Sequence, residues 1–322
     1  MRFGAKLRGI ELRLVEGTVC SGDVVGPAAF DAGAWMSLRS QNGGMTTKSS
    51  LGAVQRWQEA LAAWAIPAEI LEQAPENPWV HPPALFKVEH DAVLAMTPSV
   101  RVAIEALQAC ESGKGSVLDV GCGGGGSSMP LAEFASEFLA VDEQSAMLTN
   151  FAEAAAQREV PCRTFKGKWL DIAQRVDIAD VVVCHHVLYN VSDIASFISA
   201  LTNHARRRVV VEVPDTHPTS PFNPLWQHFW KLERPLHPTG QDLVEVLAEL
   251  GIDASVERFR RPTRKARLDA PEYIAFVRRR LCLPAERDAE IAEVVANRDL
   301  NNDEVLTLWW PGAAVLECPG PG

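Results

Sequence analysis

The chain has 322 residues, a formal net charge of −10 and a hydrophobic content of 47 %. This length allows one large or two ordinary domains with a substantial core. The acidic balance argues against a general nucleic-acid binder, which needs a broad basic face. The sequence contains no run of about 18 apolar residues, so we expect no membrane span.

The seven cysteines are scattered along the chain and odd in number. They form no Cys-x-x-Cys pair and no other metal-binding spacing, so we expect reduced thiols and no bound metal. The N-terminus has no apolar signal segment followed by a cleavage site. Together these features predict a cytoplasmic protein.

Residues 1–44 show no sustained hydrophobic period and end in a loop-like, glycine-containing stretch. We expect this segment to be a disordered extension, or translated sequence upstream of a true start at Met45. An ordered hairpin is the alternative, because Ile10, Leu12 and Leu14 alternate with polar residues.

Residues 45–99 are predicted to form a helical N-terminal cap. Its first part has apolar residues at helical spacing: Leu51, Val54, Trp57, Leu61 and Trp64. A second short helix is predicted to start at Pro67. The two tryptophans of the stripe are expected in the core, whereas Trp79 and His81, in an irregular proline-rich segment, are candidates for lining a substrate pocket.

After an amphipathic helix predicted over residues 100–109, the segment 117–128 reads VLDVGCGGGGSS. A strand, a glycine turn and then a helix beginning after Pro130 fit this order. Glycine accepts positive φ and lets a ligand approach the backbone, and N–H groups at a helix start attract a carboxylate or phosphate. The glycines fit the GxGxxG pattern of dinucleotide sites and also the pattern DxGxGxG starting at Asp119. The turn alone therefore does not identify the ligand.

A second strand is predicted over residues 138–141 and ends at Asp142, 23 positions after Asp119. Such units place an acid about here to accept hydrogen bonds from ribose hydroxyls, and two carboxylate oxygens can take both donors of a vicinal diol. The alternative is an acid that stabilises the start of a helix over residues 145–158.

The rest of the chain alternates apolar strands with helical patterns. Further strands are predicted over residues 162–165, 179–184, 208–213, 252–259 and 305–310. The uninterrupted apolar runs are typical of central parallel strands. A helix with a polar cap is predicted over residues 239–250.

Five segments, VLDVGCGGG, VDEQSAML, ADVVVC, HHVLYNV and RVVVEV, follow one another between about residues 100 and 260. In this order the chain resembles the class I S-adenosylmethionine-dependent methyltransferases, of the small-molecule type. The resemblance implies an α/β fold: a seven-stranded, mostly parallel Rossmann-like sheet, helices on both faces, a closing antiparallel hairpin and a helical N-terminal cap. The methyltransferase domain would span residues 100–311, with insertions at 215–238 and 262–303 and a tail at 312–322.

The resemblance also implies S-adenosylmethionine as cofactor. The residues expected to contact it are Asp119, Gly121, Cys122, Gly123, Gly125, Asp142, Glu143, Trp169, Leu170, Cys184 and His185. Lys168 stands where the family commonly has an acid that meets the adenine amino group, so that contact is not carried over. Trp169 could stack on adenine, with Asp171 as the acceptor, or it could fill the space between sheet and helix.

The segment after the fourth strand resembles the family's loop beside the transferred methyl group. His185 is therefore the candidate catalytic residue, as a general base or as a group that orients the acceptor. His186 is expected to be a buried, hydrogen-bonded histidine, and two adjacent histidines do not have metal-ligand spacing. Candidate substrate residues are Trp79, His81, Tyr189, Asp215, His217 and Trp230.

The function expected from this resemblance is methyl transfer to a small molecule. The alternatives are an RNA methyltransferase, a non-catalytic S-adenosylmethionine-binding protein and, further away, an NAD(P)-binding oxidoreductase. Many arginines lie between residues 258 and 280, so an acidic substrate or RNA remains an alternative ligand. Such runs of charge are usually solvated helix faces. No Asn-Pro-Pro-Tyr type motif follows the fourth strand, so we expect a small-molecule partner, no nucleic acid and no membrane.

Overall fold

The computed structural model describes residues 51–79, 95–261, 270–296, 300 and 302–313. These residues lie within one compact unit, Ser50–Gly322. The expectations for residues 1–44, for His81 and for most of the tail lie outside the described residues. Within the described part of the chain, no helix is long and apolar enough to cross a lipid bilayer.

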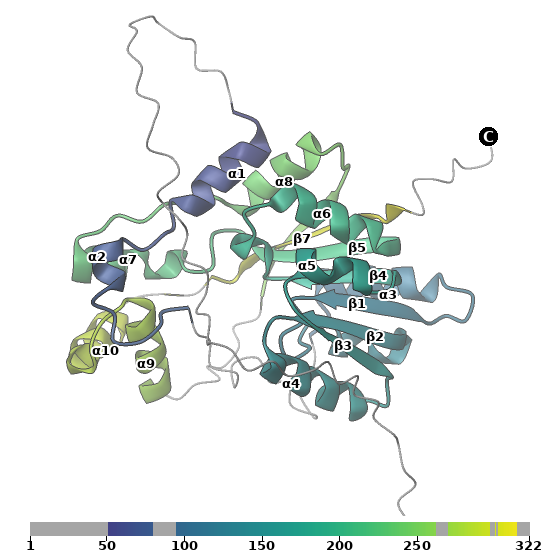
Figure 1. The fold of residues 1–322 in the computed structure, drawn as a ribbon, viewed down its shortest axis with the longest axis horizontal. Coiled ribbons are helices and arrows are strands. Elements are labelled where there is room, and N and C mark those ends of the chain that lie inside the picture. The colour runs from purple at the N-terminus through teal and green to yellow at the C-terminus, as the bar shows by residue number, and fades with distance from the viewer. Residues whose placement is uncertain (1–50, 80–94, 262–269, 297–299, 301, 314–322) are drawn as a thin grey trace, which may run out of the picture. The chain divides into compact units, whose positions relative to one another are not determined.

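Seven strands form a single sheet in the order β3-β2-β1-β4-β5-β7-β6 (Figure 1). Their bounds are β1 Gly115–Val120, β2 Ala135–Asp142, β3 Cys162–Lys166, β4 Ala179–His185, β5 Ala205–Pro214, β6 Ser255–Arg260 and β7 Glu304–Pro311. The pairs among β1 to β5 are parallel, whereas β7 is antiparallel to both β5 and β6. The predicted sheet with its closing hairpin is confirmed. Strand order reverses between β1 and β4, and open α/β sheets bind ligands at such a switch point, beyond the carboxyl ends of the strands.

Helices cover both faces of the sheet, as predicted. They are α1 Ala53–Ala62, α2 Ala68–Leu71, α3 Pro98–Gln108, α4 Ser145–Ala156, α5 Trp169–Ile172, α6 Ile194–Asn203, α7 Asn223–Trp230, α8 Gly240–Glu249, α9 Ala270–Arg280 and α10 Asp288–Ala296. One core joins the sheet to α1, α5, α6 and α8, and a second joins the opposite face to α3 and α4. Because successive strand residues point to opposite faces, strands covered on both sides need apolar residues throughout.

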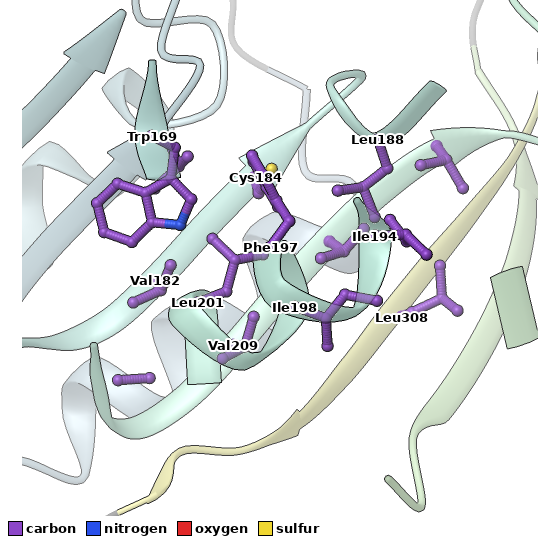
Figure 2. Packing of buried hydrophobic residues seen from close by; sticks show 14 of the residues in the cluster. Trp169, Val182, Cys184, Leu188, Ile194, Phe197, Ile198, Leu201, Val209 and Leu308 are labelled. Atoms are coloured by element: carbon purple, nitrogen blue, oxygen red, sulfur yellow. The ribbon is translucent and has the colours of Figure 1, made fainter. Parts of the chain in front are cut away.

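The packing of α6 on β4 and β5 illustrates the first core. Figure 2 shows Val182 and Val209 of the sheet against Ile198 and Leu201 of the helix. All four side chains are fully buried. Each such side chain stabilises the fold by about 1.5–3 kcal/mol relative to an exposed position.

A third core brings together segments that are distant in the sequence. It contains Ile70 of α2, Trp226 of α7, Val277 of α9 and Ile291 of α10. The described parts of the two expected insertions and of the N-terminal cap therefore share one hydrophobic cluster. Each of these short helices is amphipathic, and none could bury its apolar side alone.

The segment after the glycine turn differs from the expectation. It is a 3-10 helix, Met129–Phe134, and not an α-helix, and β2 starts at Ala135, earlier than predicted. Only six residues are left between turn and strand, which is too short for a regular amphipathic helix. The ligand-attracting helix start predicted here is therefore not formed, and the turn itself must supply the backbone donors.

Candidate functional site

The glycine turn lies at the carboxyl end of β1, where the strand order reverses. Gly121, Gly123 and Gly125 have φ values of +73°, +49° and +94°, a region that disfavours residues with a Cβ. A Cβ on Gly121 would lie 2.4 Å from Cγ2 of Val187, so the turn touches the loop after β4. The predicted glycines thus form a turn that other residues would strain or block.

Asp142 ties this turn to the neighbouring strand. One carboxylate oxygen accepts a hydrogen bond from the Gly123 N–H at 3.0 Å, and the other accepts one from the Gln144 N–H at 2.9 Å. A carboxylate offers about four acceptor positions, so both oxygens keep room for further donors. Glu143, the next residue, is exposed. The acid therefore lies against the glycine turn with acceptor positions left for a ligand.

Asp119 lies beneath the turn and is completely buried. Its Oδ2 accepts hydrogen bonds from the hydroxyls of Ser127 at 2.6 Å and Ser128 at 2.7 Å. Its Oδ1 has no hydrogen-bond partner among the described residues. Burial raises the pKa of Asp119 to about 6, although the two hydroxyls act against this. A buried acceptor without a donor is costly, and it marks a position where a ligand donor would be stabilised.

The two cysteines near the turn pack as small apolar side chains in the core. Cys122 and Cys184 are both buried, and burial raises the pKa of each thiol well above its usual value. Cys184 points into the core beneath α6 (Figure 2). Its side chain is thereby directed away from the glycine turn, and only its backbone remains for the expected cofactor contact.

Trp169 lies in the same core. Its ring packs edge-on against His204 with centroids 4.7 Å apart, and only 4 % of the residue is exposed. This position favours the filling role over stacking on adenine. Leu170 beside it is 41 % exposed, and the Gly167 N–H bonds to the Asp142 carbonyl at 3.0 Å. This loop is therefore tied to the end of β2 and carries an exposed apolar side chain three residues later.

His185 ends β4 on the same sheet face as Asp119. The two side chains share this face because Val183, two residues before His185, pairs in register with Asp119. The His185 Nε2 is buried and has no hydrogen-bond partner among the described residues. Burial lowers the pKa of His185 to about 4, opposed by the charge of Glu212. The imidazole is therefore neutral near pH 7.

A buried glutamate on β5, which was not among the predicted site residues, contacts the residue after His185. Glu212 is 1 % exposed, and its Oε2 accepts a hydrogen bond from the Ser99 hydroxyl at 2.6 Å. Its Oε1 contacts the His186 Nε2 at 3.2 Å and also the guanidinium of Arg261. Burial alone would raise the pKa of Glu212, but the His186 hydrogen bond and the positive charge of Arg261 hold it well below its usual range.

His186 is held at two points by the same strand. Its N–H donates to the Glu212 carbonyl at 2.7 Å, and its φ is +60°, which is unusual for a residue with a Cβ. The side chain is 32 % exposed, so the expectation of a hydrogen-bonded histidine holds while full burial is wrong. One sequence signal existed: a glutamate inside the valine-rich strand RVVVEV, since buried glutamates are almost always paired.

A family model described as a methyltransferase domain matches residues 117–208, from β1 into β5. Residues 117–208 therefore carry a methyltransferase domain of the class I S-adenosylmethionine-dependent type. No curated protein matches the sequence. The family-model match favours S-adenosylmethionine over the nicotinamide-dependent alternative.

Among solved structures, the methyltransferase is similar to the YcgJ protein from Bacillus subtilis, with 14 % identity over 66 % of this chain and 97 % of that one, and a TM-score of 0.45. It is also similar to the magnesium protoporphyrin IX methyltransferase ChlM from Synechocystis with bound SAH, with 18 % identity, coverage of 67 % and 82 %, and a TM-score of 0.43. A third is a SAM-dependent methyltransferase from Archaeoglobus fulgidus, with 19 % identity, coverage of 66 % and 90 %, and a TM-score of 0.40.

The residues at the switch point fit S-adenosylmethionine. The turn leaves the backbone open to a ligand, and the unpaired Oδ1 of Asp119 suits a ligand ammonium group. In the described part of the chain, no group of three histidine, cysteine or acidic side chains could hold a metal ion.

Several predicted substrate residues have structural contacts in the methyltransferase. The Tyr189 hydroxyl donates to the Pro214 carbonyl at 2.9 Å, and its buried ring stacks on Trp57 with centroids 5.5 Å apart. The His217 ring stacks on Trp64 at 3.8 Å, and burial lowers the pKa of His217 to about 3. These four aromatic side chains join α1 and the residues just after it to the segments that follow β4 and β5.

The remaining substrate candidates are dispersed. The Trp230 Nε1 donates to the Leu281 carbonyl at 2.7 Å, within the third core. Trp79 is 49 % exposed, and the Asp215 carboxylate lies 3.9 Å from the Nε of Arg258. The structure thus clusters Asp119, Asp142 and His185 around the glycine turn but does not gather the substrate candidates with them.

Proposed function

We propose that this methyltransferase transfers a methyl group to a small-molecule acceptor that binds over the carboxyl ends of β4 and β5. The observation that carries the proposal is a row of polar side chains on one face of the sheet. Asp119, His185 and Glu212 belong to three adjacent strands, β1, β4 and β5. Two of the three have a buried polar atom without a partner among the described residues, which supports a ligand-binding role.

In this proposal, the β1–β2 side holds the cofactor. Asp142 accepts the ribose hydroxyls, Asp119 accepts the ammonium group through its Oδ1, and Leu170 packs against the adenine. Gly121, Gly123 and Gly125 keep the backbone accessible. These roles follow from the acceptor positions and the open turn, because a carboxylate satisfies two hydroxyl donors and a buried one pairs well with a cation.

The β4–β5 side orients the acceptor. When bound, S-adenosylmethionine supplies a methyl group that its sulfonium charge has already activated. The protein then needs to align the nucleophile with that group and to exclude water. His185, neutral at pH 7 and with a pKa of about 4, is a weak base. It serves best as a hydrogen-bond partner that orients the nucleophile, and it takes a proton only from an acidic acceptor.

Calorimetry tests the cofactor half. Asp142→Ala removes the acceptor of both ribose hydroxyls, so S-adenosylmethionine affinity should fall by about tenfold or more. Glu153→Ala is the matched control, because this exposed acid on α4 is not among the expected cofactor contacts. Equal affinities for both variants and the wild type would contradict the assignment.

Turnover tests the acceptor half. Purified protein is incubated with radiolabelled S-adenosylmethionine and either a small-molecule extract or total RNA. Label recovered in small molecules, with reduced turnover but unchanged cofactor affinity in His185→Ala, is the expected outcome. Label in RNA would favour an RNA methyltransferase. Cofactor binding without transfer to either would favour a non-catalytic binding protein. This alternative is tested because Lys168 replaces the acid that the family commonly has at this position.

A further inference from the structure

Arg261 carries a charged group that the proposed cofactor contacts do not use. It follows directly after β6, and its side chain is 30 % exposed. Its Nη2 contacts both the Glu212 Oε1 and the His186 Nε2. Its Nε and Nη1 have no hydrogen-bond partner in the described part of the chain. A guanidinium carries five N–H donors in a rigid fork. The Nη2 donors are used by Glu212 and His186, and the other N–H groups can donate to a ligand.

The anchor itself is rigid. Glu212 is buried, ionised and fixed from its other oxygen by the Ser99 hydroxyl at 2.6 Å. Ser99 in turn lies 2.7 Å from the hydroxyl of Thr97, which caps the start of α3. A chain of hydrogen bonds therefore runs from a helix start to the guanidinium. A charge held in this way loses little conformational freedom when it binds a ligand.

The position of this group is on the acceptor side. Glu212 pairs in register with His185, and β4 separates β5 from the glycine turn on β1. Two strand spacings amount to about 10 Å, so the turn and the guanidinium are separated by about the length of a small molecule. Arg261 is thus placed to hold the far end of an acceptor whose near end faces His185.

Stability alone is a weak explanation for this cluster. A buried ion pair often stabilises a protein no more than apolar residues of the same volume would. The neighbouring Arg258 shows the ordinary use of such a residue: its Nη2 donates to Gln241 at 2.9 Å and its Nε lies 3.9 Å from Asp215. The unusual φ of His186 in the same cluster also fits a functional position.

We propose that Arg261 binds an anionic oxygen of the acceptor, and that the acceptor is a carboxylate-bearing small molecule. Glu212 is the positioning residue for this arginine. A planar carboxylate matches the free side of the guanidinium, which can donate two parallel N–H bonds to it. This inference rests on the proposed function, because it assumes that the acceptor lies over β4 and β5.

Binding of paired probes tests the inference. Full-length protein saturated with S-adenosylhomocysteine is titrated by calorimetry with benzoate and butyrate, and then with benzamide and butyramide. We expect the carboxylates to bind at least about tenfold more tightly than the amides. Arg261→Gln should abolish this preference, whereas Arg258→Gln, the matched control three residues earlier on β6, should keep it.

A second set of variants tests the positioning role. Arg261→Lys keeps the charge but loses the fork, so an intermediate preference is expected. Glu212→Gln should reduce the carboxylate preference while S-adenosylhomocysteine affinity stays unchanged. A purely structural role would leave the preference intact in every variant that still binds S-adenosylhomocysteine.

The experiment distinguishes a failure of the proposed function from a failure of the anion site. If wild-type protein does not bind S-adenosylhomocysteine, the proposed function fails first. If it binds S-adenosylhomocysteine but shows no carboxylate preference, or a preference that survives Arg261→Gln, only the anion site is overturned.

Discussion

The two halves of the proposed methyltransferase site are built in different ways. On the β1–β2 side, the contacts come from backbone groups and from two acids that end or nearly end their strands, Asp119 and Asp142. On the β4–β5 side, they come from side chains of four distant segments: Ser99, His186, Glu212 and Arg261. The first half suits a ligand that is the same throughout a family, and the second suits one that varies.

This difference follows from what each half must recognise. A glycine turn offers N–H groups and space, and it can be formed by a few consecutive residues. A side-chain cluster can change its charge and shape through single substitutions in any of its segments. The comparison predicts that backbone changes affect the cofactor, and that changes around Glu212 affect stability and the acceptor.

The largest effect is expected from Gly121→Val. The new Cβ would meet Val187 at 2.4 Å, and φ at this position is +73°. A β-branched residue is strongly strained in this region, so cofactor binding should become undetectable by calorimetry. Gly126→Val is the control, because a Cβ at Gly126 meets nothing within 4 Å. Equal binding by both variants would contradict the role of the turn.

A smaller effect is expected from Glu212→Ala, which breaks the buried pair. The free energy of unfolding should fall by about 3 kcal/mol, because Arg261 and the Ser99 hydroxyl lose their partner. Urea denaturation measures this. Glu257→Ala is the matched control: this strand glutamate also pairs with an arginine, Arg101, at 2.6 Å, but its side chain is 42 % exposed. Its loss should cost less than about 1 kcal/mol.

The smallest effect is a pH dependence of cofactor binding. Because burial raises the pKa of Asp119 to about 6, the acid is largely protonated at pH 5 and largely ionised at pH 7. Pairing with the cofactor ammonium requires the ionised form, so affinity should rise by about tenfold between these pH values. The ammonium itself stays protonated over this range. In Asp119→Asn the profile should be flat, and a wild-type affinity that falls with rising pH would contradict the pairing.

The local structure of the proposed cofactor half was largely predictable. Asp119, the glycines and Asp142 occur within one strand–turn–strand unit, where period, φ preference and spacing are local properties of the chain. The sheet followed in the same way, since buried parallel strands must be apolar throughout. What local patterns did not anticipate is the 3-10 helix Met129–Phe134, because the early start of β2 removed the room for a longer helix.

The acceptor half came into view with the packing of the chain. No periodicity links Ser99 to Glu212, 113 positions later, or Glu212 to Arg261, 49 positions later. Tyr189, His217 and Trp230 were candidate substrate residues, but their side chains pack against distant helices or bond to distant carbonyl groups. Hydrogen bonds and ring contacts between distant segments depend on which faces meet, and that is a property of the folded sheet and its layers, beyond any single stretch of sequence.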